Sequence, residues 1–173
     1  MENKDKSCCF SGHRKAHFDM EYSYYGQILK GLISKEVRKA CDMGFDTFYT
    51  GMAYGFDILA ADAVIKEKYC RLEEIKLVCA IPFRGQENTF SNHWRKYHDT
   101  ILKMADKIVV LNEEYITGCY HERNRFLVDN SRHLIGFYSQ KAGGTKHTFD
   151  YAEKCGLEIV NIWQVIQSQD PLN

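Results

Sequence analysis

The fold class is indicated first by the stretch Thr47-Phe48-Tyr49-Thr50-Gly51-Met52-Ala53-Tyr54-Gly55-Phe56-Asp57. Its first four residues are β-branched or aromatic, a composition typical of a strand. A turn with two glycines follows, and after it the apolar residues recur with the spacing of one helical face. The stretch therefore predicts a strand, a turn and a helix in direct succession. The residues of that helical face are Phe56, Leu59, Ala60, Ala63 and Val64.

The same alternation of strand and helix continues on both sides of this stretch. Upstream, a strand at 7–11 ends at Gly12 and precedes a helix at 25–41. Downstream, the run at 107–111 is apolar at its centre, which predicts a strand buried on both faces of a sheet. Strands that alternate with helices form right-handed crossovers, so we expect a mostly parallel sheet covered on both faces. The remaining elements are predicted as strands at 76–81, 133–138 and 158–162 and as helices at 94–105, 120–130 and 145–155.

The composition is that of one folded domain. The chain has 173 residues, 45% of them hydrophobic, and it contains no internal repeat or low-complexity linker. We therefore expect a single domain over 1–173, with flexible ends at about 1–6 and 167–173. Lys and Arg number 23 and Asp and Glu also number 23, so the formal net charge is zero. Zero net charge argues against a dedicated nucleic-acid or anionic-membrane binder, which usually carries a basic excess.

Cysteine and histidine usage indicates the cellular compartment. The 7 cysteines include no C-x-x-C pair, and the 7 histidines show no H-E-x-x-H spacing. This pattern is typical of buried, reduced thiols in a cytosolic protein, so we expect a cytoplasmic location and no metal site. The residues at 1–6 are polar and charged, and no apolar run approaches the roughly 20 residues that span a bilayer, so no membrane association is expected.

Glycines gather where the predicted strands end. In a parallel sheet, ligands bind in the crevice beyond the carboxyl ends of the strands. Gly51 and Gly55 follow one strand, and Gly143-Gly144-Thr145 follow another. A glycine lets backbone N–H groups approach a phosphate closely, and a helix N-terminus adds unpaired N–H donors. These two turns are candidate phosphate cradles, although glycine turns are also common as plain connectors.

Charged side chains at the same strand ends fit an anionic ligand. Arg14 and Arg84 are candidates for charge-assisted hydrogen bonds to phosphate. Asp57, in the first turn of its helix, can accept from a ribose hydroxyl or cap that helix. Lys141 and Lys146 follow the fifth strand, so a basic crevice is expected in a chain of zero net charge.

Two familiar phosphate-binding fingerprints are missing from the sequence. There is no G-x-x-x-x-G-K-[ST], which argues against a P-loop NTPase. The G-x-G-x-x-G of NAD-dependent dehydrogenases does not follow the first strand either, which argues against a standard hydride-transfer enzyme.

Three segments carry a family resemblance. They are Ser11-Gly12-His13-Arg14, then Thr50-Gly51-Met52-Ala53-Tyr54-Gly55-Phe56-Asp57, and finally the late segment with Arg123-Asn124, Asp129-Asn130-Ser131 and Gly143-Gly144-Thr145. These segments are similar to motifs of the YpsA-like family of the SLOG superfamily, which is related to DprA and to the LOG phosphoribohydrolases. The resemblance runs from about Cys8 to Trp163. It implies a Rossmann-like three-layer α/β/α sandwich with a mostly parallel sheet.

The resemblance also implies a function and a site. The expected ligand is a nucleotide or a nucleotide-derived small molecule, such as NAD or ADP-ribose, and the expected role is that of a sensor or regulator. A homo-oligomer is left open, and nucleic acid is not expected as a partner because of the charge balance. Arg84 is added to the residues that the resemblance implies, because it follows a predicted strand at the same edge of the sheet. The expected ligand-binding residues are Gly12, His13, Arg14, Gly51, Met52, Ala53, Gly55, Asp57, Arg84, Arg123, Asn124, Gly143, Gly144 and Thr145.

Departures from the related enzymes leave two alternative functions. LOG enzymes carry P-G-G-x-G-T-x-x-E, whereas the stretch at 141–148, Lys-Ala-Gly-Gly-Thr-Lys-His-Thr, lacks the glutamate. The first alternative is a LOG-like hydrolase that cleaves a nucleotide N-glycosidic bond. Because that glutamate is missing, Asp57 and Glu122 are the candidate catalytic carboxylates in its place. The second is a DprA-like DNA- or protein-interaction module linked to cell division.

Three side chains have two interpretations each. His13 either contacts ligand, as an acid or base, or hydrogen-bonds a neighbouring loop. Tyr54 either stacks on a purine or is an ordinary loop tyrosine. Arg123 either borders the pocket, as the resemblance implies, or belongs with Glu122 and Arg125 to a solvated helix face.

Overall fold

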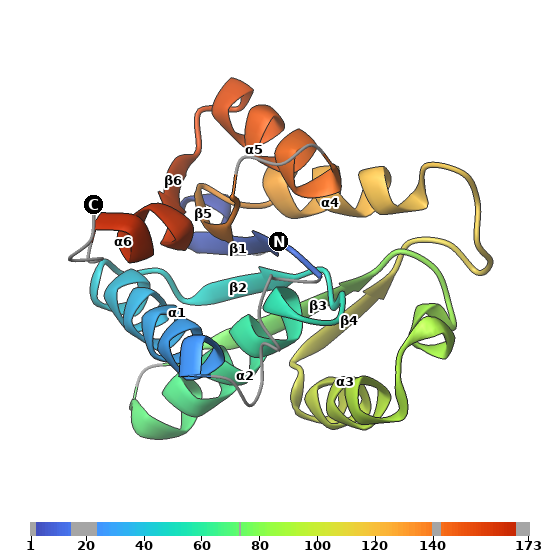
Figure 1. The fold of residues 1–173 in the computed structure, drawn as a ribbon, viewed down its shortest axis with the longest axis horizontal. Helices are drawn as coiled ribbons and strands as arrows, with labels where there is room; N and C mark the ends of the chain where they lie inside the picture. The colour runs from blue at the N-terminus through green and yellow to red at the C-terminus, as the bar shows by residue number, and fades with distance from the viewer. Residues whose placement is uncertain (1–2, 15–23, 73, 140–142, 169–173) are drawn as a thin grey trace.

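A six-stranded, wholly parallel sheet forms the centre of the protein (Figure 1). The computed structural model describes residues 3–14, 24–72, 74–139 and 143–168. The strand order is β4-β3-β2-β1-β5-β6. The strands are β1 (Ser7–Gly12), β2 (Thr47–Thr50), β3 (Lys76–Ile81), β4 (Lys107–Val110), β5 (His133–Phe137) and β6 (Glu158–Asn161).

Helices cover both faces of the sheet. Figure 1 shows α1, α2 and α3 below the sheet and α4 and α5 above it, while α6 returns to lie beside α1. The predicted Rossmann-like three-layer α/β/α sandwich is therefore confirmed. The α-helices are α1 (Tyr24–Asp42), α2 (Phe56–Cys70), α3 (Asn92–Met104), α4 (Cys119–Asp129), α5 (Gly144–Lys154) and α6 (Ile162–Ser168), with short 3₁₀ helices at Lys4–Lys6 and Gln86–Thr89.

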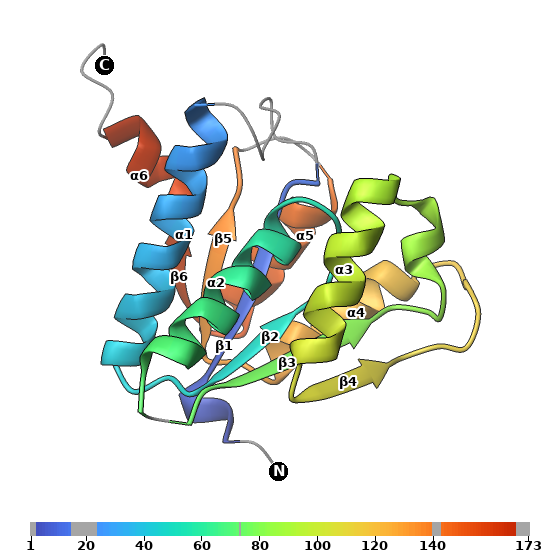
Figure 2. The ribbon, with the colours of Figure 1, turned by 90° about the horizontal axis from the view of Figure 1, so that it is seen from below.

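The order of the strands reverses at β1. This strand pairs with β2 on one side, where Ser7 is opposite Thr47, and with β5 on the other, where Cys8 is opposite His133. Figure 2 shows β1 and β5 side by side, with their carboxyl ends toward the top of the view. In parallel α/β sheets the ligand crevice opens at such a switch point, because the loops after the two strands diverge to opposite faces. The fold thus directs attention to the loops after β1 and β5.

Each face of the sheet has its own apolar core. On the face of α1 and α2, the rings of Phe10 and Phe48 stack with centroids 6.0 Å apart. On the face of α4 and α5, Cys9 packs in a cluster with Leu134 and Phe149. Burial raises the pKa of the Cys9 thiol to about 12, so this thiol stays protonated and acts as a small apolar side chain.

One sequence prediction about the elements was wrong, and one helix, α6, was not predicted. β4 is not buried on both faces, because it is the edge strand of the sheet and Ile108 is 47% exposed. The predicted last strand at 158–162 ends at Asn161, and the chain continues directly as α6. Of the ends expected to be flexible, Lys4–Lys6 forms a 3₁₀ helix and 167–168 belong to α6, while 1–2 and 169–173 lie outside the described residues.

In the described part of the chain, no helix combines the length and the apolar character needed to cross a bilayer.

Gly12, at the end of β1, lies directly against the buried ring of Phe56. A Cβ at this position would lie 2.3–2.5 Å from three atoms of Phe56, and Phe56 is fully buried. We expect Gly12→Ala to lower the free energy of unfolding by about 1–2 kcal/mol, because the ring has no space to move into. Gly31→Ala is the matched control: a Cβ there meets nothing within 4 Å, and alanine favours α1 by about 0.5–1 kcal/mol. Urea denaturation of both variants checks the prediction, and equal stabilities would contradict it.

Candidate functional site at the carboxyl edge of the sheet

A cavity of about 420 Å³ opens beyond the carboxyl end of β1. Its size falls within the range of roughly 300–1,000 Å³ that is usual for small-molecule sites. The loops after β1 and β2 and the N-terminal turns of α4 and α5 all contribute to its wall. The lining residues are Ser11, Gly12, His13, Arg14, Ala53, Asp57, Tyr120, His121, Arg123, Asn124, Gly144 and Thr145.

A buried ion pair forms the floor of this cavity. Asp57, in the first turn of α2, lies 3.7 Å from Arg123 on α4, and the two residues are 5% and 4% exposed. Arg123 also donates to the carbonyl of Gly51 and, through Nε, to Oδ1 of Asn124 at 2.8 Å. Asp57 accepts from the backbone N–H of Ala53 at 3.4 Å. Because α2 and α4 cover opposite faces of the sheet, this pair joins the two helical layers.

Burial dominates the electrostatics of the pair. It raises the pKa of Asp57, against the lowering effects of the Arg123 guanidinium, the Ala53 N–H, Arg14 and the Gly12 N–H. Burial also lowers the pKa of Arg123, and the charge of Asp57 only partly offsets this. A pair whose desolvation exceeds its mutual attraction adds little stability, and such groups beside a cavity are typical of functional sites. The interpretation of Arg123 as part of a solvated helix face was wrong.

Arg14 brings a second positive charge to the cavity. Its guanidinium carbon lies 4.6 Å from the ring centroid of Tyr120 and 6.0 Å from that of Tyr54. Within the described ranges, Arg14 makes no ion pair with a carboxylate. Arg14 and Arg123 together outweigh Asp57, so the cavity has a net positive charge that suits an anionic group.

His13 ties two strand-end loops together. Its Nε2 accepts a hydrogen bond from the backbone N–H of Ser139, which follows β5, at 3.0 Å. The Ser139 hydroxyl lies 3.1 Å from the same nitrogen. A ring nitrogen that accepts carries no proton, so the neutral ring holds its proton on Nδ1. This geometry matches the loop-bonding interpretation of His13, and the side chain also lines the cavity.

Three helices begin at the cavity. The first turns of α2, α4 and α5 supply Asp57, Tyr120 and Thr145 to its lining. Each helix has a glycine N-cap whose position offers no side-chain oxygen to the first N–H groups. Uncapped N–H groups and the positive end of the helix dipole favour an anion at this place.

The glycines of the site serve different purposes. A Cβ on Gly51 would lie 2.0 Å from the Arg123 guanidinium, and Gly55, with φ of +90°, would meet the Arg14 carbonyl at 2.6 Å. These two glycines and the fully buried Met52 lie outside the cavity lining and are explained by packing. Gly143 also lies outside the lining, whereas Gly144 belongs to it, and among the described residues a Cβ at either position would meet nothing within 4 Å. The open backbone for a phosphate is therefore the start of α5.

Other predicted side chains point elsewhere. Arg84 is exposed and paired with Glu113 at 2.8 Å. Glu122 accepts from Nδ2 of Asn112 at 2.9 Å, and both Arg84 and Glu122 lie outside the cavity lining. Lys146 pairs with Asp150 at 2.6 Å, and Lys141 lies outside the described residues.

Sequence reasoning missed three lining residues, Ser11, Tyr120 and His121. A usable signal existed for the last two. They open the helix that follows β4, and the first turn of a helix on this edge faces the crevice whatever its residue types.

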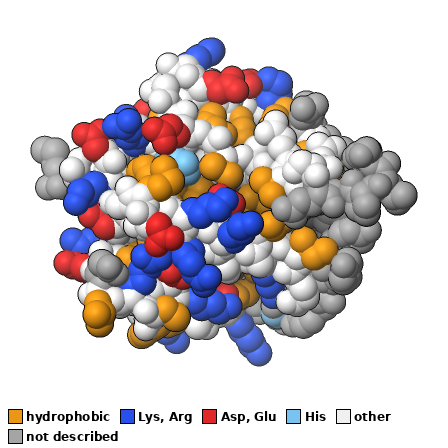
Figure 3. Space-filling view, turned by 90° about the vertical axis from the view of Figure 1, so that its left-hand side faces the viewer, with side chains coloured by type: hydrophobic (Ala, Val, Ile, Leu, Met, Phe, Trp, Pro, Cys, Tyr) orange, Lys and Arg blue, Asp and Glu red, His pale blue; other side chains and the backbone are white. Residues whose placement is uncertain are grey.

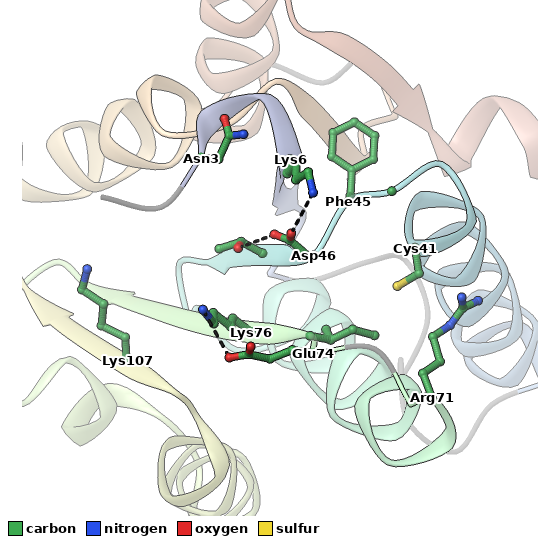
Figure 4. A pocket seen from close by; sticks show the side chains of 12 residues that line it. Asn3, Lys6, Cys41, Phe45, Asp46, Arg71, Glu74, Lys76 and Lys107 are labelled. Carbon is green, nitrogen blue, oxygen red and sulfur yellow. Dashed lines mark hydrogen bonds and ion pairs between the residues drawn. The ribbon is translucent and has the colours of Figure 1, made fainter.

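A larger cavity, of about 740 Å³, lies at the opposite edge of the sheet (Figure 4). Its cations already have partners: Lys6 pairs with Asp46 at 3.8 Å, and Lys76 with Glu74 at 3.3 Å. The C-terminal ends of α1 and α2 lie beside it and disfavour anions. The smaller cavity at the carboxyl edge is therefore the candidate site.

Across 3–14, 24–72, 74–139 and 143–168, no three His, Cys, Asp or Glu side chains gather closely enough to hold a metal ion.

The chain is similar in sequence to known proteins. The model of the YspA SLOG family (YpsA) matches residues 8–166. The uncharacterized SPbeta prophage-derived protein YoqJ of Bacillus subtilis (strain 168) is 26% identical over 144 residues, which cover 75% of this chain and 78% of that protein. The UPF0398 protein ABC2016 of Shouchella clausii is 28% identical over 120 residues, 68% of this chain and 63% of that protein.

Two solved structures share the fold. DNA processing protein A (DprA) of Streptococcus pneumoniae matches with a TM-score of 0.63 and 17% identity, over 90% of this chain and 50% of that one. DprA of Helicobacter pylori, described for its single-stranded DNA binding mode, matches with a TM-score of 0.61 and 17% identity, over 88% and 63%. The chain thus spans only part of DprA, and the likeness concerns the fold. The family match over nearly the whole sequence confirms the resemblance: the chain belongs to the YpsA family of SLOG proteins.

Proposed function

We propose that the carboxyl-edge cavity binds a nucleotide or nucleotide-derived ligand through its phosphate, and that the protein acts as a sensor or regulator. The observation that carries this proposal is the convergence of three uncapped helix starts with Arg14 and Arg123 around one carboxylate, Asp57. A phosphate fits this charge balance, since it replaces water at free N–H groups and gains charge-assisted bonds.

Each part of the ligand has a complementary part of the cavity. The open backbone at Gly144 and Thr145 suits the phosphate, and Arg14 can swing from its aromatic neighbours to pair with it. Asp57 suits a ribose hydroxyl as an acceptor. A separate hollow of about 230 Å³ between α4 and α5 shares the lining residues His121 and Asn124 with the cavity.

Thermal unfolding in the presence of ADP-ribose, NAD or ADP tests the proposal. A ligand present at 100 times its Kd stabilises the folded state by about 2.7 kcal/mol, which we expect to appear as a rise in Tm of several degrees. Adenosine, which lacks a phosphate, is the control and is expected to give a far smaller rise. A flat response of well-folded protein to every phosphate-bearing compound would contradict the proposal.

Hydrolysis of a nucleotide N-glycosidic bond is the second candidate. The observation in its favour is the Asp57 carboxyl, which lines the cavity with a raised pKa, as a general acid requires. Incubation with nucleoside monophosphates at high protein concentration tests it. Release of free base that Asp57→Asn abolishes supports hydrolysis, and absence of base removes this candidate.

Single-stranded DNA is the third candidate, favoured by the likeness to DprA. The charge distribution counts against it. On the side of β6 and α6, Lys and Arg side chains lie interspersed with Asp and Glu (Figure 3), in keeping with the 23 to 23 balance of the chain. A DNA-binding surface predicts affinity for oligonucleotides that falls steeply with salt concentration. Titration of a labelled single strand at two salt concentrations decides this point.

A further inference from the structure

Three aromatic rings meet at the rim of the candidate site. Phe83 follows β3, Tyr115 follows β4, and Tyr120 lies in the first turn of α4. The ring centroids of Phe83 lie 5.4 Å from Tyr115 and 5.9 Å from Tyr120, and the two tyrosines are 6.3 Å apart. Tyr115 is 61% exposed. An aromatic cluster at the mouth of a polar cavity is a surface on which a planar group can stack.

Tyr120 is the member of this cluster that lines the cavity. Phe83 and Tyr115 pack at steep angles against its ring, with interplanar angles of 75° and 57°, and the Arg14 guanidinium lies over the ring at 4.6 Å. Tyr54, the other aromatic neighbour of Arg14, packs against Phe90 at 5.3 Å and lies outside the cavity lining. The planar Arg14 guanidinium therefore covers the only Phe, Tyr or Trp ring among the described residues that line the cavity.

We propose that Tyr120 is the base platform of the site and that Arg14 covers it only in the absence of ligand. The ligand class is then a nucleotide that retains its base, rather than a sugar phosphate. When such a ligand binds, its phosphate pairs with Arg14 in charge-assisted bonds, which are stronger than the contact of a guanidinium with a ring. The base then stacks on the vacated face of Tyr120. This inference rests on the proposed function.

The test compares a base-bearing probe with a base-free one on three variants. We expect Tyr120→Leu to weaken ADP binding about tenfold, as measured by calorimetry, because a base–aromatic stack contributes about that much. Tyr120→Phe keeps the ring and should retain ADP affinity within about twofold. Tyr69→Leu removes an exposed ring of α2 that lies outside both this aromatic cluster and the cavity lining, and it serves as the matched control. Ribose 5-phosphate should bind all three variants and the wild type equally.

The wild type alone already tests the idea if a variant fails to fold. ADP that binds no more tightly than ribose 5-phosphate would overturn the platform and leave the phosphate site standing. A Tyr120→Leu variant that binds ADP and ribose 5-phosphate equally less tightly would also overturn the platform. The ring would then maintain the shape of the site rather than stack on the base. Binding of neither probe to the wild type would overturn the platform together with the proposed function.

Discussion

Arg123→Met is expected to lower the free energy of unfolding by about 3–5 kcal/mol, the largest loss foreseen for this protein. The variant leaves the Asp57 carboxylate, 5% exposed, without its counter-charge. It also removes the donor to the Gly51 carbonyl. Methionine keeps most of the side-chain volume, so the loss reports the missing charge and hydrogen bonds rather than a cavity. Urea denaturation at neutral pH measures it.

The double variant Asp57→Asn/Arg123→Met separates the ion pair from the packing around it. With the carboxylate neutralised as well, no charge is buried alone, so most of the lost stability should return. A double variant as unstable as Arg123→Met would mean that the hydrogen bonds of Arg123, and not the charge of Asp57, determine the loss. If the free energy of unfolding of Arg123→Met lies within about 1 kcal/mol of the wild-type value, the claim that Arg123 and Asp57 form a buried ion pair is contradicted.

The loss of unfolding free energy caused by Arg123→Met should increase as the pH rises from mildly acidic to neutral. Burial raises the folded-state pKa of Asp57 above its ordinary value of 3.8, and Arg123 is the main group that lowers it. Without Arg123 this pKa rises further. A carboxyl with a raised folded pKa contributes stability below its unfolded pKa, and this contribution is lost as pH rises through the folded value. The difference between variant and wild type should therefore shrink in mildly acidic solution and be greatest at neutral pH.

The order of strands and helices could be predicted from the sequence, because each element is indicated by the residues within it. The run 76–81 became β3 over the same residues, and the periodic stripe after Ser91 became α3 with Ser91 as its N-cap. The edge of the sheet that holds the candidate cavity could also be predicted, since alternating elements imply parallel strands whose carboxyl ends lie together. The position of β4 at the edge of the sheet could not be predicted, because an apolar run has the same composition in a central strand and in an edge strand.

The side-chain arrangement of the site depends on distant partners and was harder to predict. Asp57 and Arg123 lie on helices at opposite faces of the sheet, and nothing near either residue indicates the other. Arg14 and Arg84 both follow strands at the same edge, yet Arg84 turns to Glu113 and Arg14 turns into the cavity. Sequence pattern places the backbone of such residues, whereas tertiary neighbours determine the direction of their long side chains.

Arg14→Ala is expected to weaken binding of ADP-ribose by about 100-fold while leaving the unliganded protein folded. The loss corresponds to about 2–3 kcal/mol, the contribution of hydrogen bonds between a guanidinium and a phosphate. In the unliganded state the Arg14 guanidinium lies against the rings of Tyr120 and Tyr54 and forms no ion pair with a described carboxylate, so removing it should lower stability by at most about 1 kcal/mol. Calorimetric titration gives the first quantity and thermal unfolding without ligand gives the second.

Arg84→Ala is the matched control for this experiment, since it removes an exposed arginine that follows β3 and is paired with Glu113. Its affinity for ADP-ribose should equal that of the wild type. Arg14→Lys keeps the charge but loses the planar fork, so an intermediate affinity is expected. Equal affinities of Arg14→Ala and Arg84→Ala would show that phosphate is bound without Arg14, by the helix starts alone. A large loss of stability in unliganded Arg14→Ala would instead make Arg14 a structural residue, because its ring contacts would then hold the loop after β1 in place.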